Sequence, residues 1–251
     1  MIFKSFLSNR CTEIIFGSIL GDGSLRIQKP YVNARLSFRH AISQKEYFFW
    51  KVDQLKEISS DKCWWRQKAD GYGGEKLRYQ SLATEPLTQI YHIAHHHNQT
   101  QIKRRWLNIL TPLSLLIWWL DDGSIIGNGR KGVFCTDSFT LKEQQILARY
   151  LLVVWKVRVS IGKITRKKEN GSEGVYYRLW FRSSEELQKF MTIILPYLQV
   201  ESMLPKVILL YKDSQLQQRW ISEIVNRTGF SQSIVEKYLV EKKEKWKHFR
   251  K

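Results

Sequence analysis

Two apolar runs stand out along the chain, because each is long enough for about two helical turns and each stops at Asp-Gly. The runs cover residues 15–20 and 115–120, and they end at Asp22 and Asp122, which are 100 positions apart. A glycine directly after such a run is typical of a helix C-terminus. An aspartate at that negative helix end is disfavoured unless a cation joins it. The pattern therefore predicts a duplicated unit with one unusual carboxylate in each half.

Alternating polar and apolar residues follow the first run and predict half-buried strands with a polar open face. Ser43 and Glu46 have the spacing of a capping box, which predicts a helix start there. Strands are expected over 25–28, 33–39, 64–68 and 76–83, with a turn at 70–74, and helices over 43–58 and 86–96.

The second half repeats the order of the first. Pro112 fits the first position of a helix, and Thr140 with Glu143 forms another capping box. Strands are expected over 133–136, 158–167 and 175–182, with a turn at 170–171, and helices over 111–122, 140–155 and 183–195. The expected fold class is α+β: an αββαββα unit occurs twice, as halves 1–108 and 109–212, with two four-stranded antiparallel sheets.

Residues 213–251 form a separate segment that resembles a helix-turn-helix. Gly229 permits the turn, and Ser231 can cap the second helix. Two helices that merely pack on the body are the alternative. From Glu241 onward the chain is highly charged and is expected to fray.

The formal net charge of +18 favours a polyanionic partner, because contacts to phosphate supply most nonspecific affinity for nucleic acids. Most of this charge lies outside residues 213–251, so it is not a basic tail. A solvated basic surface is the alternative. No apolar run reaches the ~18 residues of a membrane-spanning helix, and Met1–Leu7 does not resemble a signal peptide. The three cysteines, Cys11, Cys63 and Cys135, are odd in number and widely spaced, which indicates reduced thiols without structural zinc.

Over residues 12–212 the chain resembles the LAGLIDADG homing endonucleases in their two-motif, single-chain form. The glycines and aspartate of the first run, Gly17, Gly21, Asp22 and Gly23, stand where the family has them. The second run departs from the family, with Ile117 and Asp121 in place of helix glycines, although its ending is a common form of the motif. The resemblance implies motif helices that cross, a monomer with internal pseudo-twofold symmetry, and cleavage of a long asymmetric site in double-stranded DNA.

The resemblance also implies the catalytic residues. Asp22 and Asp122 would bind Mg²⁺ or Mn²⁺, assisted by the backbone carbonyls of Gly21 and Asp121. Lys206 takes the position of the family's second-half lysine. For the first half, strict spacing points to Gln99 or Gln101, and Lys103 is the nearest lysine. Ordinary helix-end aspartates are the alternative to the metal site.

Strand ribbons enter the major groove and read base edges with Arg, Gln and Asn side chains. The polar positions of the strands and of the second tail helix are therefore the candidates for contact with DNA, although any one of them can also be simply solvated. They are Arg26, Gln28, Asn33, Arg35, Ser37, Arg39, Arg66, Lys76, Arg78 and Gln80 in the first half, Lys163, Arg166, Arg178 and Arg182 in the second, and Gln232, Ser233 and Lys237 in the tail. We expect the tail to extend the DNA footprint and to take no part in the chemistry.

Four histidines, His92, His95, His96 and His97, form a conspicuous cluster. Histidines at i and i+4 can bind a transition metal, but no carboxylate or cysteine accompanies them, so a polar helix end near DNA is favoured.

The sequence thus predicts a site-specific homing endonuclease of an intracellular compartment, an organelle (chloroplast or mitochondrion) or the bacterial cytoplasm. Its gene is expected inside an intron, because intein splicing residues are not evident. Two alternatives remain: an RNA-binding maturase that acts on its own intron, and a non-cleaving DNA-binding regulator.

Overall fold

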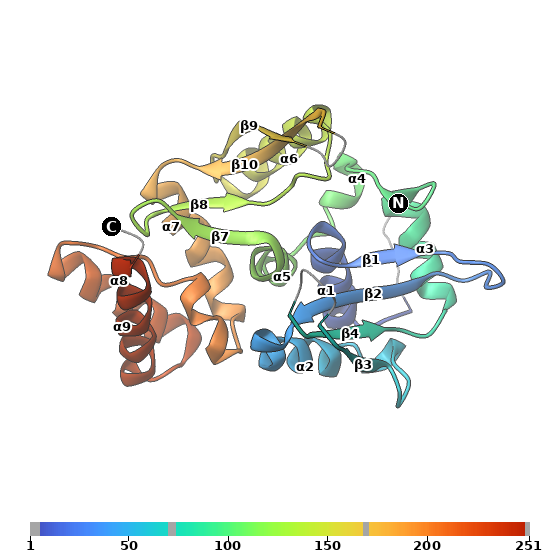
Figure 1. Ribbon diagram of the computed structural model, residues 1–251, viewed down its shortest axis with the longest axis horizontal. Helices are drawn as coiled ribbons and strands as arrows, with labels where there is room; N and C mark the ends of the chain where they lie inside the picture. Colours follow the sequence, from blue (N-terminus) through green and yellow to red (C-terminus); the bar gives the residue numbers. More distant parts are fainter. Residues whose placement is uncertain (1–5, 70–73, 168–170, 249–251) are drawn as a thin grey trace. The chain divides into compact units, whose positions relative to one another are not determined.

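The structure, a computed structural model, describes residues 6–69, 74–167 and 171–248 (Figure 1). Residues 70–73 of the first predicted turn and residue 170 of the second therefore lie outside the described residues. The chain divides into two compact units, Met1–Asp121 and Asp122–Lys251. The second motif helix groups with the first unit except for its last residue, and the tail groups with the second unit.

The first unit has a four-stranded antiparallel sheet in the order β1-β2-β4-β3. Its elements are α1 (Asn9–Leu20), β1 (Ser24–Arg26), β2 (Arg35–Ala41), α2 (Lys45–Gln54), β3 (Trp64–Gln67), β4 (Lys76–Gln80), α3 (Glu85–Ala94), α4 (Arg104–Leu107) and α5 (Pro112–Asp122). The αββαββα order predicted for this half is confirmed. Leu36, Phe38 and His40 on β2 are buried beneath the helices, while Ser37 and Arg39 lie on the open face.

The two motif helices α1 and α5 approach closely, because glycines on α1 leave room for the backbone of α5. A Cβ on Gly17 would lie 2.5 Å from the carbonyl oxygen of Ser114, and a Cβ on Gly21 would lie 2.5 Å from the Cβ of Asp121. The Ser114 hydroxyl donates to the carbonyl of Glu13 at 2.9 Å, which joins the two helices. Gly17 and Gly21 of the first motif are therefore required by packing.

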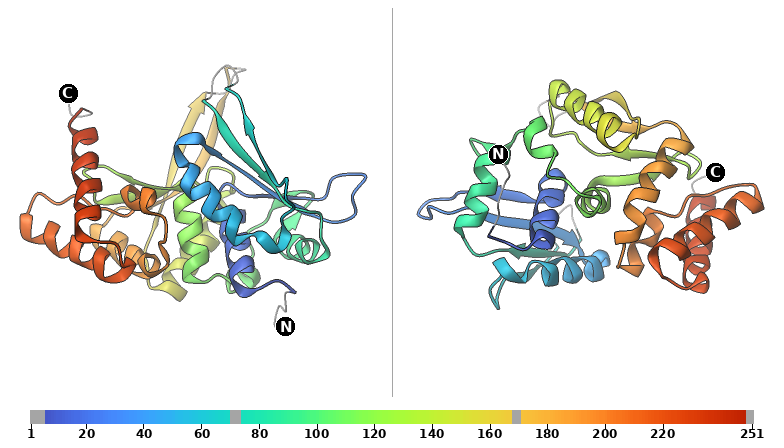
Figure 2. Two further views of the ribbon diagram at one scale, coloured as in Figure 1. Left: turned by 90° about the horizontal axis from the view of Figure 1, so that it is seen from below. Right: turned by 180° about the vertical axis from the view of Figure 1, so that it is seen from behind.

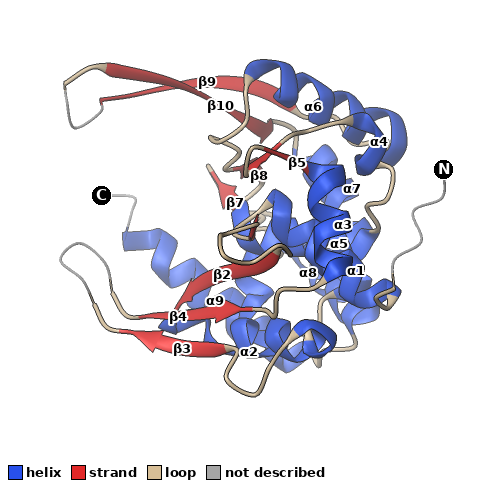
Figure 3. Cartoon of the chain, turned by 90° about the vertical axis from the view of Figure 1, so that its right-hand side faces the viewer, coloured by secondary structure: helices blue, strands red, loops and turns tan. Residues whose placement is uncertain are grey.

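The second unit repeats the arrangement with a sheet in the order β7-β8-β10-β9. Its elements are β7 (Gly123–Ile126), β8 (Lys131–Phe134), α6 (Leu141–Trp155), β9 (Ser160–Lys167), β10 (Glu173–Phe181), α7 (Ser184–Ile194), the 3₁₀ helix η4 (Glu201–Lys206), α8 (Ser214–Thr228) and α9 (Gln232–His248). The capping box of Thr140 and Glu143 is confirmed. β9 and β10 form a long two-stranded ribbon (Figures 2 and 3).

The tail forms two helices, α8 and α9, that pack side by side (Figure 1). Gly229 takes φ 77° at the end of α8, and the Ser231 hydroxyl accepts from the backbone N–H of Ile234 at 3.4 Å. The predicted turn and cap are thus present. The expected fraying from Glu241 is wrong, because α9 continues to His248 and buries Lys242 on its inner side.

Two local expectations are corrected. Ser43 does not cap α2, because residues 42–44 form a 3₁₀ turn and the helix begins after Gln44 without a side-chain cap. The helix predicted to reach His96 ends at Ala94, and a short hairpin, β5 (His95–His96) with β6 (Gln99–Thr100), follows it. In the described part of the chain, the helices are too short or too polar to cross a membrane.

Candidate functional site

Asp22 lies beside a cavity of about 480 Å³ on the open face of the first sheet. The Asp22 side chain is 42% exposed. Polar side chains from all four strands and the adjoining loop share the cavity with Asp22: Ser24, Arg26, Gln28, Ser37, Arg39, Trp65, Arg78 and Gln80. Six of the residues proposed for DNA contact are therefore gathered around the first motif aspartate.

Arg66, another predicted DNA contact, does not line this cavity. Arg66 is paired in register with the buried Leu77, so its Cα–Cβ bond leaves the strand on the helix-covered face, and its guanidinium bonds Glu75. Its neighbour Trp65 is paired with Arg78 on the open face and is 43% exposed. Two adjacent tryptophans gave no alternation from which to choose the face of this strand.

Three further candidates of the first unit have other surroundings. The amide oxygen of Asn33 accepts from the Thr88 hydroxyl at 3.0 Å, and the Arg35 guanidinium stacks over Tyr31 at 3.8 Å from the ring centre. Lys76 is in register with Ala41 and shares the open face, but it does not line the cavity.

A buried ion pair holds the carboxylate of Asp121, the residue before the second motif aspartate. Its Oδ1 accepts from the Tyr47 hydroxyl at 2.7 Å and from the Lys51 ammonium at 3.0 Å. Its Oδ2 accepts from Lys51 at 2.8 Å and from the backbone N–H of Asp22 at 3.3 Å. The side chains of Lys51 and Asp121 are both 0% exposed. Burial, followed by the charge of Asp121, raises the pKa of Tyr47, so its hydroxyl stays protonated and donates.

His40 lies between the two acidic residues. Its Nδ1 is 3.5 Å from Oδ2 of Asp22, and its Nε2 is 3.8 Å from Oδ1 of Asp121. The ring is almost fully buried on β2 and packs against Tyr47. Asp22 therefore contacts the buried cluster in two ways: its backbone N–H donates to Asp121, and its carboxylate lies beside the His40 imidazole.

Sequence reasoning missed Lys51, Tyr47 and His40. Two signals could have found the lysine. The first signal is Asp121, which puts a carboxylate where two helices pack together. A buried charge requires a partner of opposite charge. Lys51 also follows Tyr47 by four positions, which puts a cation on the apolar face of α2.

Among the described residues, Asp22, His40 and Asp121 form a group of potential metal ligands. The donor set suits a cation only in part. Both carboxylate oxygens of Asp121 already accept a hydrogen bond from the Lys51 ammonium, and this positive charge would repel a metal cation. Asp22, partly exposed at the cavity, offers the carboxylate oxygens that Mg²⁺ or Mn²⁺ prefers. The geometry thus favours the predicted ligand Asp22 over the carboxylate of Asp121.

In the second unit, Lys206 lies at the end of the second motif. Its ammonium donates to the carbonyl of Gly123 at 2.9 Å, directly after Asp122. The carbonyl of Asp122 accepts from the backbone N–H of Cys135 at 3.0 Å. Cys135 directly follows β8, so this hydrogen bond holds the end of the second motif against that strand. The structure thus places Lys206, the lysine that the resemblance implied for the second half, at the motif end.

The open face of the second sheet carries an ionic cluster around Asp137. Arg178 bonds Asp137, and Arg166 lies 2.9 Å from the same carboxylate. The hydrogen bond from Arg178 lowers the pKa of Asp137. Arg182 is exposed beyond the end of β10. Lys163 is in register with Tyr177 and so lies on the face of the buried Leu179, opposite Arg178.

Two other predicted features lie apart from these groups. Lys103 is exposed at the start of α4, and the cation at Asp121 is Lys51 instead. His95 is buried, bonds the Thr100 hydroxyl at 3.2 Å and stacks on Tyr91. Burial and then Arg26 lower the pKa of His95 to about 4. The described histidines of this stretch do not group as metal ligands.

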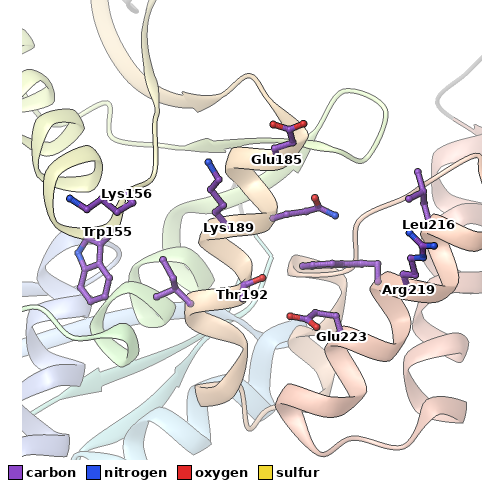
Figure 4. A pocket seen from close by; sticks show the side chains of 11 residues that line it. Trp155, Lys156, Glu185, Lys189, Thr192, Leu216, Arg219 and Glu223 are labelled. Carbon is purple, nitrogen blue, oxygen red and sulfur yellow. The ribbon is translucent and has the colours of Figure 1, made fainter.

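A larger groove of about 700 Å³ lies in the second unit between α6, α7 and α8 (Figure 4). Its lining includes the apolar side chains Trp155, Ile193 and Trp220 and charged side chains such as Lys189 and Glu223. The groove is not lined by either motif aspartate or by a predicted catalytic residue.

The sequence profile of the LAGLIDADG DNA endonuclease family matches residues 12–190. The chain therefore belongs to this family. The fold is that of a homing endonuclease: the structure is similar to I-WcaI bound to its DNA recognition sequence, with a TM-score of 0.67 and 20% identity over 83% of this chain and 90% of that one.

Curated relatives match at low identity. The cytochrome b mRNA maturase bI2 of Saccharomyces cerevisiae is 27% identical over 203 residues, which cover 76% of this chain and 46% of the relative. Protein RecA of Mycobacterium gastri is 33% identical over 121 residues, 47% of this chain and 27% of that protein. The chain thus spans about half or less of the length of these relatives.

Proposed function

We propose that the chain is a site-specific endonuclease that hydrolyses phosphodiesters of double-stranded DNA with a divalent metal. The carrying observation is the cavity of the first sheet, in which Asp22 opens onto a surface of arginine and glutamine side chains. Family membership supports the reaction class, and I-WcaI, a homing endonuclease of similar fold, binds its DNA recognition sequence.

Asp22 and Asp122 would hold Mg²⁺ or Mn²⁺, and the carbonyls of Gly21 and Asp121 would assist. A cation held there would supply two kinds of chemistry: activation of water as the nucleophile and neutralisation of charge on the phosphate. Arg26, Arg39 and Arg78 bind the backbone and bases beside Asp22. Lys206 stabilises charge near Asp122, and His40 orients the Asp22 carboxylate. Lys103 remains a weaker candidate for the first half. A single chain suffices, because each unit carries one motif aspartate.

The test uses purified protein, Mg²⁺ and the intronless version of its host gene. A double-strand cut at one position, lost when EDTA removes the metal, is the expected result. Complete absence of cutting on this substrate, together with binding to the intron transcript, would instead support an RNA maturase. The relative bI2, an mRNA maturase, is the observation that keeps this second function open.

DNA affinity is expected to fall steeply with salt, because the net charge of +18 favours contacts to many phosphates. For 6–10 phosphate contacts the loss is about 10³–10⁵-fold between 50 and 200 mM salt. A titration by fluorescence anisotropy in EDTA at several salt concentrations measures the slope. A flat dependence would contradict the charge argument.

The two strands are expected to respond unequally to Lys206→Ala. Lys206 contacts the motif end of the second unit, whereas the first unit has a buried, ion-paired Lys51 in contact with Asp121. Cleavage of one strand should therefore slow more than the other, and nicked DNA should accumulate. End-labelling of each strand in turn measures both rates, and equal slowing would count against the asymmetry.

The tail is proposed as an additional DNA contact. Three polar side chains of α9 are exposed, as the sequence indicated: Gln232, Ser233 and Lys237. The turn before them contains Gly229 with a positive φ, as expected for the turn of a helix-turn-helix. Each base contact that α9 makes would contribute ~1–3 kcal/mol. The tail also donates hydrogen bonds to the segment 205–209 of its own unit, which contains the proposed catalytic residue Lys206.

A further inference from the structure

The segment that carries Lys206 is held by side chains of the tail. The Lys242 ammonium donates to the carbonyls of Pro205 and Ile208, both at 2.6 Å. The Trp220 indole donates to the carbonyl of Val207 at 3.1 Å. The Gln217 amide donates to the carbonyl of Leu209 at 3.0 Å. Within residues 205–209, four backbone carbonyls therefore accept hydrogen bonds from α8 and α9.

Lys242 has the most central place in this clamp. Its two acceptors flank Lys206 and Val207 in the chain, and it is 7% exposed. Burial lowers the pKa of Lys242 to about 7, while the two carbonyls favour its charged form. A buried amine is costly unless its hydrogen bonds are satisfied. An apolar residue at this place would avoid that cost. The buried amine is satisfied by two carbonyls of the segment 205–209, and these hydrogen bonds therefore fix the backbone of the segment.

The other end of Lys206 is equally defined. Its ammonium donates to the carbonyl of Gly123, and a cavity of about 260 Å³ is lined both by Lys206 and by residues of α9. The cavity is lined by Ser124, Lys206, Tyr238, Lys242 and Trp246 among others. The backbone of Lys206 is thus anchored by the tail, and its side chain points to the motif.

We infer that Lys242 is a positioning residue for Lys206, through which the tail takes part in cleavage by the second unit. This inference rests on the proposed nuclease function. It goes beyond the expectation that the tail only extends the footprint. A chain ended at about Tyr211 would lose the clamp on residues 205–209 together with any DNA contact.

The first experiment is a double-mutant cycle with Lys242→Met and Lys206→Ala. Methionine keeps the length and removes both hydrogen bonds. Single-turnover cleavage with end-labelled strands should show that Lys242→Met slows the same strand as Lys206→Ala, by about tenfold, with unchanged DNA affinity. The double variant should be no slower than Lys206→Ala alone, because the two residues act as one unit. Additive slowing would overturn the inference.

Lys243→Met is the matched control, because Lys243 is the next residue on α9, is exposed and loses the same charge. It should leave both strand rates unchanged. If Lys242→Met unfolds the unit, Trp220→Phe removes the neighbouring donor and keeps an aromatic ring. It should slow the same strand to a smaller extent, and equal slowing of both strands would overturn the inference.

Amide hydrogen exchange provides a readout that needs no cleavage. In Lys242→Met, exchange over residues 204–210 should rise about tenfold, while exchange in β10 and in Lys243→Met stays at the wild-type rate. Unchanged exchange over 204–210 would overturn the inference even in an active enzyme. If the wild-type chain cuts no DNA but the exchange result holds, the proposed function fails and the clamp remains.

Discussion

Asp22→Asn and Asp122→Asn are each expected to abolish double-strand cleavage while DNA binding stays near the wild-type level. Asparagine keeps the shape of the side chain and removes the charge that a divalent cation requires. The loss should exceed about 100-fold in rate, since removing even an outer partner of a metal ligand costs roughly 10–100-fold. Cleavage rates in Mg²⁺ and binding in EDTA, measured on the same labelled duplex, separate the two effects.

Asp61→Asn is the control for the loss of one negative charge, because Asp61 is exposed and does not line the cavity of the first sheet. It should cut at the wild-type rate. If Asp22→Asn and Asp122→Asn also cut at that rate, both aspartates are structural and the site assignment is wrong. Rescue of Asp22→Asn by Mn²⁺ in place of Mg²⁺ would further support direct metal binding, since Mg²⁺ demands near-ideal octahedral geometry and loses its water reluctantly.

Much of the fold followed from local pattern. The period of two in β2 and the capping box at Thr140 each depend on residues close together in the chain, and the structure confirms both. The close approach at Gly17 and Gly21 also agrees with the resemblance, because only residues without a side chain leave that space.

What the sequence did not predict has two physical causes. Arg66 and Lys163 are in register with residues of the helix-covered face, and the sequence did not indicate this because a one-residue shift in phase moves a strand's side chains across the sheet. The pair of Lys51 and Asp121 joins residues 70 positions apart, and no local pattern links such partners. The tail's clamp on residues 205–209 is missed for the same reason, since Lys242 is 37 positions from Pro205.

Lys51→Met is expected to lower the free energy of unfolding by about 3–5 kcal/mol, since it leaves the Asp121 carboxylate buried without its cation. Urea unfolding, followed by tryptophan fluorescence, measures the change. Lys45→Met is the matched control: Lys45 is exposed at the start of the same helix, and surface substitutions of this kind stay within about 0.5 kcal/mol.

The double variant Lys51→Met with Asp121→Asn distinguishes a charge effect from a packing effect. Asparagine removes the buried charge and still offers an oxygen to the Tyr47 hydroxyl, which now donates at 2.7 Å. Most of the lost stability should therefore return, because replacing both members of a buried ion pair costs far less than removing one. If the double variant is as unstable as Lys51→Met alone, the lysine stabilises the helix pair by its packing against Phe38 and Tyr47. In that case the carboxylate of Asp121 does not depend on Lys51 for its place in the core.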